Sequence, residues 1–215
     1  MMEFVFLSNK GKRENNEDAY ANYKSEFFLV ADGLGGRPAG EVAAKIAAET
    51  ATSIYQFSKK EKPKRLLRNV FDRANNEILL RSKENKKWYG MGTTAVCVLI
   101  SRNKLYFANV GDSRGYLFSD GKLTLKTQDD RDDWSSLLEA LGADEEVKPH
   151  ISIVKSGKND VVLLCSDGLS DFVSDEIIEK ILRSKVSLKN KAEGLVDAAL
   201  QFGSTDNITA GLIKL

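Results

Sequence analysis

The sequence is poor in the side chains that build zinc centres and disulfide frameworks. Of its 215 residues, one is a histidine, His150, and two are cysteines, Cys97 and Cys165, each inside an apolar run. A zinc site usually takes three or four nitrogen and sulfur ligands, so this chain lacks the donors for one. Two separated thiols also exclude a disulfide-rich scaffold. Any metal chemistry here must therefore use oxygen ligands.

Long apolar segments and an excess of one charge are also missing. No stretch approaches eighteen apolar residues, and residues 1–13 lack a basic region followed by a long apolar one, so neither a membrane span nor an export signal is expected. The 32 Lys and Arg residues balance the 31 Asp and Glu residues, which leaves no general attraction to nucleic acid or to an anionic membrane. We predict a soluble, cytoplasmic protein with no nucleic-acid or membrane partner.

What the chain does contain is a globular composition. Hydrophobic residues make up 42% and charged residues 29%, and there are only 3 prolines, which excludes the disordered and collagenous classes. Domains typically hold about 150 residues, so a chain of this length favours one large domain, residues 1–215. No repeat, linker or low-complexity segment divides it.

The spacing of apolar residues predicts helices in pairs and strands in runs. Helices are expected at 38–59, 63–83, 174–184 and 188–201, with a short one at 134–141. Strands are expected at 3–8, 26–32, 150–155, 160–166 and 207–214, and four more runs between 92 and 127 predict a meander of hairpins. Because helices and strands are segregated, we predict an α+β sandwich of antiparallel sheets flanked by helix pairs.

Two of the three Asp-Gly pairs follow strongly apolar runs. Asp32-Gly33 ends FFLVAD and Asp167-Gly168 ends VVLLCSD, whereas Asp120-Gly121 lies among polar residues and needs only a hairpin turn. A carboxylate that emerges from a buried strand is costly unless a cation or several donors meet it. A glycine beside it lets the backbone carbonyl approach as a second oxygen ligand.

Further acidic residues share this character. Glu17 and Asp18 lie in NNEDAY, Asp112 lies in NVGDSRGY, and Asp206 opens the last predicted strand in STDNIT. Taken singly, each is as well explained by a turn or a helix cap. Several carboxylates converging from distant parts of a chain, without His or Cys, indicate a Mg²⁺ or Mn²⁺ site.

Six motifs occur in a fixed order along the chain. They are Arg13 with Asn16-Glu17-Asp18, VADGLGG with Gly40-Glu41, MGTT, NVGDSRGY, LLCSDGLSDF and STDNIT. From about residue 9 to the C-terminus they closely resemble the metal-dependent protein phosphatase 2C family in its bacterial form. The resemblance implies a four-layer αββα sandwich, with two central antiparallel sheets flanked by helix pairs and the metals in a cleft at one end.

The resemblance also implies a set of metal ligands for Mn²⁺ or Mg²⁺. Asp32 would bridge two ions and the Gly33 carbonyl would bind the first, while Asp167 and Asp206 would complete the second. Asp18 and Glu17 would hold metal-bound waters. Asp112, with Asp167, is similar to the pair that holds a third, weaker ion in bacterial members.

The implied activity is that of a serine/threonine protein phosphatase acting on phosphorylated proteins. Asp32 and Asp167 would be central to catalysis, and Arg13 would hold two phosphate oxygens with its planar fork. Water shared by the two cations would attack the phosphorus directly, without a phosphoenzyme. Two other functions stay open: a pseudo-phosphatase that binds phosphoproteins without turnover, and a metal-dependent hydrolase of small phosphate esters.

The chain departs from the family at two histidines. Arg37 follows Gly36 where bacterial members have a histidine, and Thr127-Gln128-Asp129-Asp130 ends in aspartate where they read T-x-D-H. His150 lies too far along the chain to replace the latter. Arg37 is interpreted as a supplement to Arg13. Because the usual proton donor is missing, we expect a larger handicap on phosphoserine than on aryl phosphates.

A second departure is a shortening. Family members place a flap subdomain before an ALG stretch, but here only Arg131–Glu139 separate Asp130 from Ala140-Leu141-Gly142. We expect an open cleft that a protein partner or second subunit covers. Trp134 is the candidate contact, and the alternative is that Trp134 caps the core.

Overall fold

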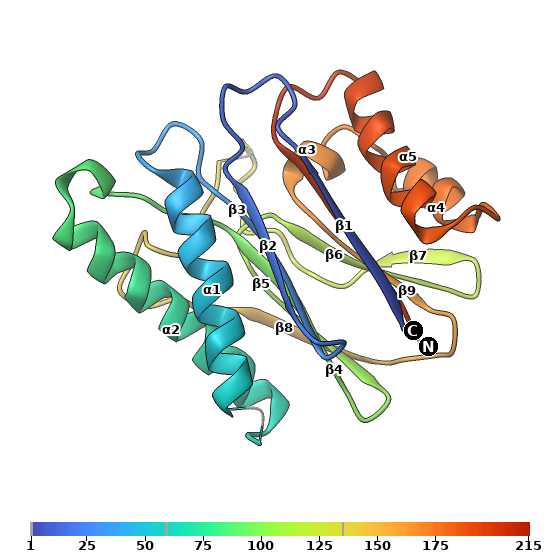
Figure 1. Cartoon of the computed structure of the whole chain (residues 1–215), viewed down its shortest axis with the longest axis horizontal. Helices are drawn as coiled ribbons and strands as arrows, with labels where there is room; N and C mark the ends of the chain where they lie inside the picture. The colour runs from blue at the N-terminus through green and yellow to red at the C-terminus, as the bar shows by residue number, and fades with distance from the viewer. Residues whose placement is uncertain (1, 59, 135) are drawn as a thin grey trace.

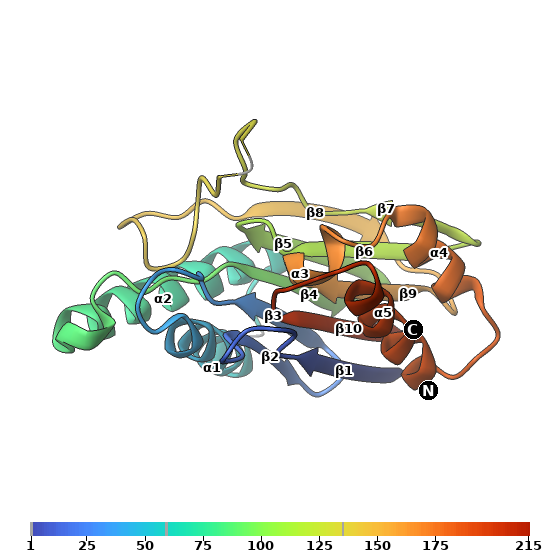
Figure 2. The same cartoon turned by 90° about the horizontal axis from the view of Figure 1, so that it is seen from above.

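The computed structural model describes residues 2–58, 60–134 and 136–215, which contain two five-stranded antiparallel sheets. The first sheet has the order β1 (Glu3–Asn9), β10 (Ile208–Lys214), β9 (Val161–Cys165), β6 (Arg114–Ser119), β7 (Lys122–Leu125). The second has the order β2 (Asp18–Tyr23), β3 (Phe27–Asp32), β4 (Ala95–Ser101), β5 (Lys104–Val110), β8 (His150–Lys155). The two sheets pack face to face, and a group of helices covers each outer face (Figures 1 and 2).

Each sheet carries helices on its outer face. The second sheet is covered by α1 (Gly40–Ser58) and α2 (Pro63–Glu84), which is followed by the 3-10 turn η1 (Lys86–Trp88). The first sheet is covered by α3 (Asp167–Ser170), α4 (Asp175–Arg183) and α5 (Leu188–Gln201). The predicted α+β, four-layer αββα architecture is therefore confirmed. Within the described residues, no helix combines the length and apolar character needed to cross a bilayer.

The core has three apolar parts, one between the sheets and one under each helical layer. Between the sheets, β3 and β9 bring Phe28, Val30 and Leu164 together without exposure to solvent. These strands are buried on both faces, as their continuous apolar runs predicted. Each fully buried side chain of this size stabilises the fold by about 1.5–3 kcal/mol. This interior fixes the spacing of the two sheets.

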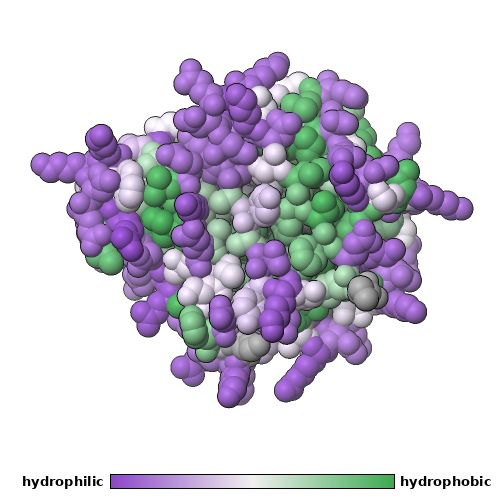
Figure 3. All heavy atoms as spheres, viewed as in Figure 1, coloured by the Kyte–Doolittle hydropathy of each residue, from purple (hydrophilic) through white to green (hydrophobic). Residues whose placement is uncertain are grey.

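The edge strands β1 and β2 run next to each other on one side of the sandwich. Phe6 of β1 stacks on Tyr20 of β2, with ring centroids 4.9 Å apart. Hydrophilic residues line the outer parts of this face, whereas apolar residues gather along its middle, between the helical layers (Figure 3). The chain termini meet here because β1 and β10 pair antiparallel, with Glu3 opposite Lys214.

The prediction of a short helix at 134–141 is wrong. The described residues of that segment form turns and isolated bridges, and Ser135 lies outside the described residues. Asp132 Oδ1 accepts hydrogen bonds from the backbone N–H groups of Trp134 (2.9 Å) and Ser136 (2.8 Å). A side chain that captures nearby N–H groups competes with a helix for them, so the chain turns back on itself instead.

The meander predicted between residues 92 and 127 is present as two hairpins, which lie in different sheets. The hairpin β4–β5 belongs to the second sheet and the hairpin β6–β7 to the first. The chain crosses between the sheets at Gly111, whose φ of +92° suits glycine. The turn at Asp120-Gly121 is confirmed, since both residues have the positive φ of a type I′ hairpin.

Helix α1 begins at Gly40, two residues later than predicted. Ala39 has a φ of +55°, outside the helical region, and its carbonyl accepts hydrogen bonds from Val42 N and Ala43 N. Pro38 thus lies in the turn before the helix. Residue 59, the predicted end of this helix, lies outside the described residues.

Candidate active site

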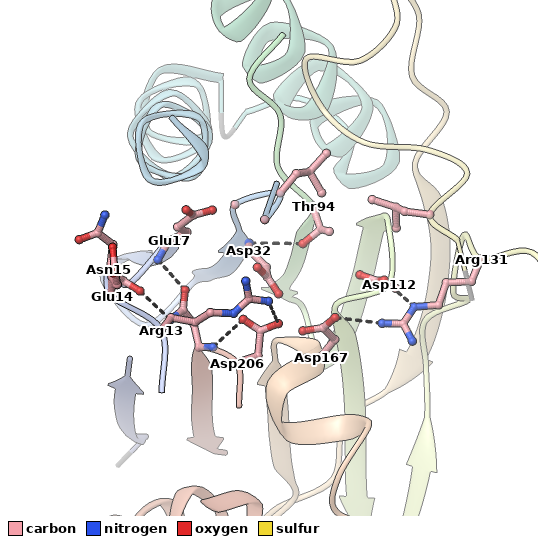
Figure 4. A pocket seen from close by; sticks show the side chains of 15 residues that line it. Arg13, Glu14, Asn15, Glu17, Asp32, Thr94, Asp112, Arg131, Asp167 and Asp206 are labelled. Carbon is pink, nitrogen blue, oxygen red and sulfur yellow. Dashed lines mark hydrogen bonds and ion pairs between the residues drawn. The ribbon is translucent and has the colours of Figure 1, made fainter. Parts of the chain in front are cut away.

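Carboxylates from both sheets converge on a cleft at one end of the sandwich. The cleft encloses a cavity of about 500 Å³. Its lining includes Glu17, Asp32, Gly33, Asp112, Asp167 and Asp206, together with the guanidinium groups of Arg13 and Arg131 (Figure 4). The structure thus brings these predicted site residues together, and Asp18 is the register partner of Asp32 on the neighbouring strand. Strand ends, loops and the first residue of a short helix supply these side chains.

Asp32 and Asp18 face each other across the β2–β3 pair, where they are direct register partners. The Asp32 backbone is fixed because its carbonyl accepts hydrogen bonds from Thr94 N (2.8 Å) and Thr93 Oγ1 (2.7 Å). Burial, followed by the neighbouring Asp18 and Asp167 carboxylates, raises the pKa of Asp32 well above its usual range. A cation beside Asp32 would oppose this shift.

Asp18 connects the two sheets. Its Oδ2 accepts hydrogen bonds from Thr209 Oγ1 (2.6 Å) of β10 and from Ser166 Oγ (2.9 Å) at the end of β9. Burial raises the pKa of Asp18, while these two hydroxyl groups partly oppose that shift. The other oxygen, Oδ1, is buried with no hydrogen-bond partner in the part of the chain that the structure describes.

Asp167 and Asp206 come from the first sheet. Asp167 opens α3 directly after β9, and Asp206 lies just before β10. Their loops touch so closely that a Cβ on Gly168 would lie 2.0 Å from the carbonyl oxygen of Asn207. Burial, with the nearby Asp112 and Asp171 carboxylates, raises the pKa of Asp167 to about 7.

Arg13 lies at the mouth of the cleft, on the loop that joins β1 to β2. Its Nη2 donates a 2.7 Å hydrogen bond to Asp206 Oδ2, and its side chain is 49% exposed. The guanidinium also lies against Gly35, where a Cβ would come within 3.4 Å of Nη1. The arginine therefore packs against the backbone of this loop.

Sequence reasoning missed Asn207, which organises the Arg13 loop. Asn207 Oδ1 accepts a 2.7 Å hydrogen bond from Glu17 N, and Nδ2 donates to the carbonyls of Lys10 and Asn15, each at 2.9 Å. The signal was present, since Asn207 follows Asp206 in the STDNIT motif. One side chain thus positions the segment that carries both Arg13 and Glu17.

Sequence reasoning also missed Arg131, the first residue of the shortened segment. Arg131 Nε donates to Asp112 Oδ2 at 2.5 Å, Nη1 to Asp171 Oδ2 at 2.8 Å and Nη2 to Asp167 Oδ2 at 3.0 Å (Figure 4). The positions of three acids in space decide these contacts, and no local sequence pattern announces them.

The residues that replace the two family histidines are absent from the described lining of the cleft. Arg37 is exposed and lines a neighbouring cavity, with Nη1 3.5 Å from the Gly90 carbonyl, and its role as a supplement to Arg13 stays a prediction. Asp130 is buried, and its Oδ2 accepts a 2.8 Å hydrogen bond from Gly111 N. Asp130 therefore has a structural role.

His150 is closer to Asp130 than its place in the sequence suggested. His150 Nε2 lies 2.7 Å from Asp130 Oδ1, because β8 pairs with β5 and sets His150 opposite Asn109. No histidine is among the described residues that line the cavity. Trp134 is 88% exposed, so the alternative in which it caps the core is wrong.

The donor set fits divalent cations that prefer oxygen. Glu17 Oε2 and Asp18 Oδ1 are buried and unpartnered within the described residues, and a nearby cation would satisfy such acceptors. No three acidic, histidine or cysteine side chains in the described ranges surround a single point closely enough to hold an ion alone. Ions here need backbone oxygen and water as well, as is usual for Mg²⁺. Gly33 can offer its carbonyl at this place.

Comparisons with known proteins agree with this geometry. Residues 3–132 match the family described as protein phosphatase 2C. The chain is 32% identical to the serine/threonine phosphatase stp of Listeria monocytogenes serovar 1/2a, over 99% of this chain and 96% of that protein. It is 33% identical to the serine/threonine protein phosphatase PstP of Mycobacterium tuberculosis, over 97% of this chain and 44% of that protein.

Solved structures give the same answer. Serine/threonine phosphatase Stp1 from Staphylococcus aureus is similar with a TM-score of 0.93 and 29% identity, over 100% of this chain and 95% of that one. The catalytic domain of PstP in complex with two manganese ions is similar with a TM-score of 0.85 and 32% identity, over 99% and 97% of the two chains.

A two-sheet sandwich in which both sheets supply carboxylates to one cleft, with an arginine at its mouth, is the design of a metal-dependent phosphatase. This chain belongs to the protein phosphatase 2C family, and it is a serine/threonine protein phosphatase. Its substrates are phosphoproteins. Nothing in the comparisons favours the pseudo-phosphatase or the small-ester hydrolase.

Proposed function

We propose that this phosphatase works with two divalent ions, Mn²⁺ or Mg²⁺, held by Asp32, the Gly33 carbonyl, Asp167 and Asp206. The observation that carries this proposal is the convergence of buried carboxylates from both sheets, two of which keep unpartnered oxygens. When bound, the ions would acidify water to give the nucleophile and would neutralise charge on the phosphoryl oxygens.

Asp18 and Glu17 hold water around the ions in this proposal. Hydroxyl groups fix the Oδ2 side of Asp18, which leaves Oδ1 free to accept from a water. Glu17 is placed by its own backbone, because its N–H donates to Asn207 and its carbonyl accepts from Gly33 N at 3.1 Å. The two acids therefore need little rearrangement to act.

Arg13 binds the phosphoryl group of the substrate. Its guanidinium lies at the open end of the cavity and is half exposed, so an incoming phosphate reaches it without a change of fold. The planar fork matches two phosphate oxygens and keeps its charge at every relevant pH. Its contact with Asp206 aims the fork toward the carboxylates.

The leaving alkoxide takes its proton from water. The described residues lining the cavity include no histidine or lysine, and the Asp130–His150 pair lies outside it. Water is a poor acid, so the departure of a serine or threonine alkoxide is the demanding part of the reaction.

The shortened segment leaves the cleft open to a protein. Trp134 and Leu138, which are 88% and 61% exposed, stand on this segment, and we propose that the substrate protein or another partner packs on them. In this proposal residues 1–215 act as one phosphatase domain, and the cytoplasmic location expected from the sequence stays a prediction.

The test is hydrolysis of an aryl phosphate and of a phosphothreonine peptide by metal-stripped protein, with and without added Mn²⁺. We expect activity only with Mn²⁺, and its loss in Asp32→Asn and Asp167→Asn. Asp72→Asn is the matched control, since Asp72 is an exposed acid on α2. Tight Mn²⁺ binding without turnover would instead support the pseudo-phosphatase.

A further inference from the structure

Arg131 is the least expected side chain in the cleft. Each of its three nitrogens contacts a different carboxylate, those of Asp112, Asp167 and Asp171, at 2.5–3.0 Å. The guanidinium is 18% exposed and Asp112 only 9%. Asp167 and Asp171 are 28% and 36% exposed, so the cluster is buried on its Asp112 side and reaches solvent on its Asp171 side. Acids gathered this closely and partly removed from solvent need a cation, and here the chain supplies it.

Two hydrogen bonds hold the Arg131 and Asp112 segments together. Asp130 N donates to the Gly111 carbonyl at 3.2 Å, and Gly111 N donates to Asp130 Oδ2 at 2.8 Å. Gly111 directly precedes Asp112, and Asp130 directly precedes Arg131. The reciprocal pair therefore sets the arginine beside the acid, and His150 holds the far side of the same carboxylate.

The turn that follows fixes the backbone of Arg131 from its other side. Leu138 N donates to the Asp130 carbonyl at 2.7 Å, Asp132 N donates to the Ser136 carbonyl at 2.9 Å, and Arg131 is bridged to Leu137. The segment is thus tied back on itself immediately after the arginine. Because the backbone on both sides of Arg131 is already fixed, only the side-chain torsions lose entropy when the guanidinium pairs with the three acids.

We propose that the Arg131 guanidinium is a built-in cation that takes the place of a further divalent ion between Asp112, Asp167 and Asp171, so that this phosphatase binds two ions. The inference rests on the proposed two-ion function of the same cleft. A fixed guanidinium neutralises the acidic cluster at any metal concentration. Because Arg131 contacts Asp167 through Oδ2, the other oxygen, Oδ1, remains available to one of the two proposed ions.

The first measurement is the number of Mn²⁺ ions bound per chain, obtained by equilibrium dialysis of the full-length protein with Mn²⁺ alone. We expect two ions for the unchanged protein and three for Arg131→Met, with the added one weaker. The added ion should disappear again in Arg131→Met/Asp171→Asn, which removes one of its ligands. Three ions in the unchanged protein, or two in Arg131→Met, would overturn the inference.

Arg114→Met is the matched control. Arg114 is similarly buried and pairs with Asp129 at 2.6 Å, but it does not line the cavity, so its loss should leave two ions. Arg131→Lys keeps the charge and should also remain at two, which tests the inference should Arg131→Met fold poorly. If the unchanged protein binds fewer than two ions, the proposed function itself fails. If it binds three and still hydrolyses phosphopeptides, only the role of Arg131 fails.

Discussion

Arg13 and Asp206 form an ion pair at the mouth of the cleft, with Nη2 of the arginine 2.7 Å from Oδ2 of the acid. The group proposed to bind phosphate thus contacts a proposed metal ligand. If Asp206 binds an ion as proposed, its negative charge is neutralised, the ion pair weakens, and the guanidinium of Arg13 becomes available to the substrate. We therefore expect metal binding and phosphate binding to be coupled through this contact.

Arg13→Ala should lower kcat/KM for a phosphothreonine peptide by about 10- to 100-fold, because charge-assisted hydrogen bonds contribute about 1.5–3 kcal/mol each. Most of the loss should be in KM. Arg13→Lys should lie between, since it keeps the charge without the fork. Arg37→Ala is the control, because Arg37 faces Gly90. Equal effects of the two alanine variants would contradict the assignment.

The rate of hydrolysis should depend strongly on the basicity of the leaving group. Because the described cavity lining holds no histidine or lysine, we expect kcat for aryl phosphates to fall steeply as the phenol pKa rises, and phosphoserine peptides to be slowest. A series of substituted phenyl phosphates, assayed at one Mn²⁺ concentration, gives the slope. A flat series would show that some group in the protein does protonate the leaving oxygen.

The stability of the metal-free protein should fall as pH rises toward 7. The folded state raises the pKa of Asp167 to about 7, whereas the same group in an unfolded chain titrates near 3.8. Between these values the folded state binds more protons than the unfolded state, so the contribution of Asp167 is lost with rising pH. Thermal unfolding in chelator from pH 5 to 8 measures this slope, and Asp167→Asn should flatten it.

Manganese should reverse that dependence, because ions bind the ionised carboxylate. Mn²⁺ affinity should therefore weaken as pH falls below about 7. An affinity that does not change between pH 5 and 8 would argue against Asp167 as a ligand.

Two glycines should respond to alanine in opposite directions. A Cβ on Gly33 would lie 2.4 Å from the Gly40 carbonyl oxygen and 2.8 Å from that of Glu17, and backbone atoms cannot swing away. We expect Gly33→Ala to cost about 3 kcal/mol of unfolding free energy and to weaken Mn²⁺ binding. Gly194→Ala, inside α5 and 3.7 Å from its nearest neighbour, should stabilise the protein by about 0.5–1 kcal/mol. Urea unfolding measures both.

The sequence predicted those features that depend on local pattern. The apolar runs before Asp32 and Asp167 predicted buried strands, and the Asp120-Gly121 pair predicted a hairpin. The ordered motifs predicted that the cleft carboxylates lie together. Each of these signals lies within a few neighbouring residues, where hydrophobic period and turn chemistry act directly.

Long-range contacts explain what sequence reasoning missed. Arg131 reaches Asp167 and Asp171 across the cleft, and His150 reaches Asp130 only because β8 adds to the edge of the second sheet. The division of the predicted meander between two sheets has the same cause, since a crossing at Gly111 sends β6 to the other sheet. Contacts of this kind depend on the packed fold, which no short window of sequence contains.

Because the carboxylates are divided between the sheets, the distance between the sheets sets the distance between the acids. Asp18 and Asp32 belong to the second sheet, whereas Asp167 and Asp206 adjoin strands of the first. The apolar layer that separates the sheets includes Phe28, Val30 and Leu164. A smaller side chain in this layer, for example in Phe28→Leu, would alter the distance between the acids without changing any of the acids. We therefore expect substitutions in this core, far from the phosphate, to change metal affinity.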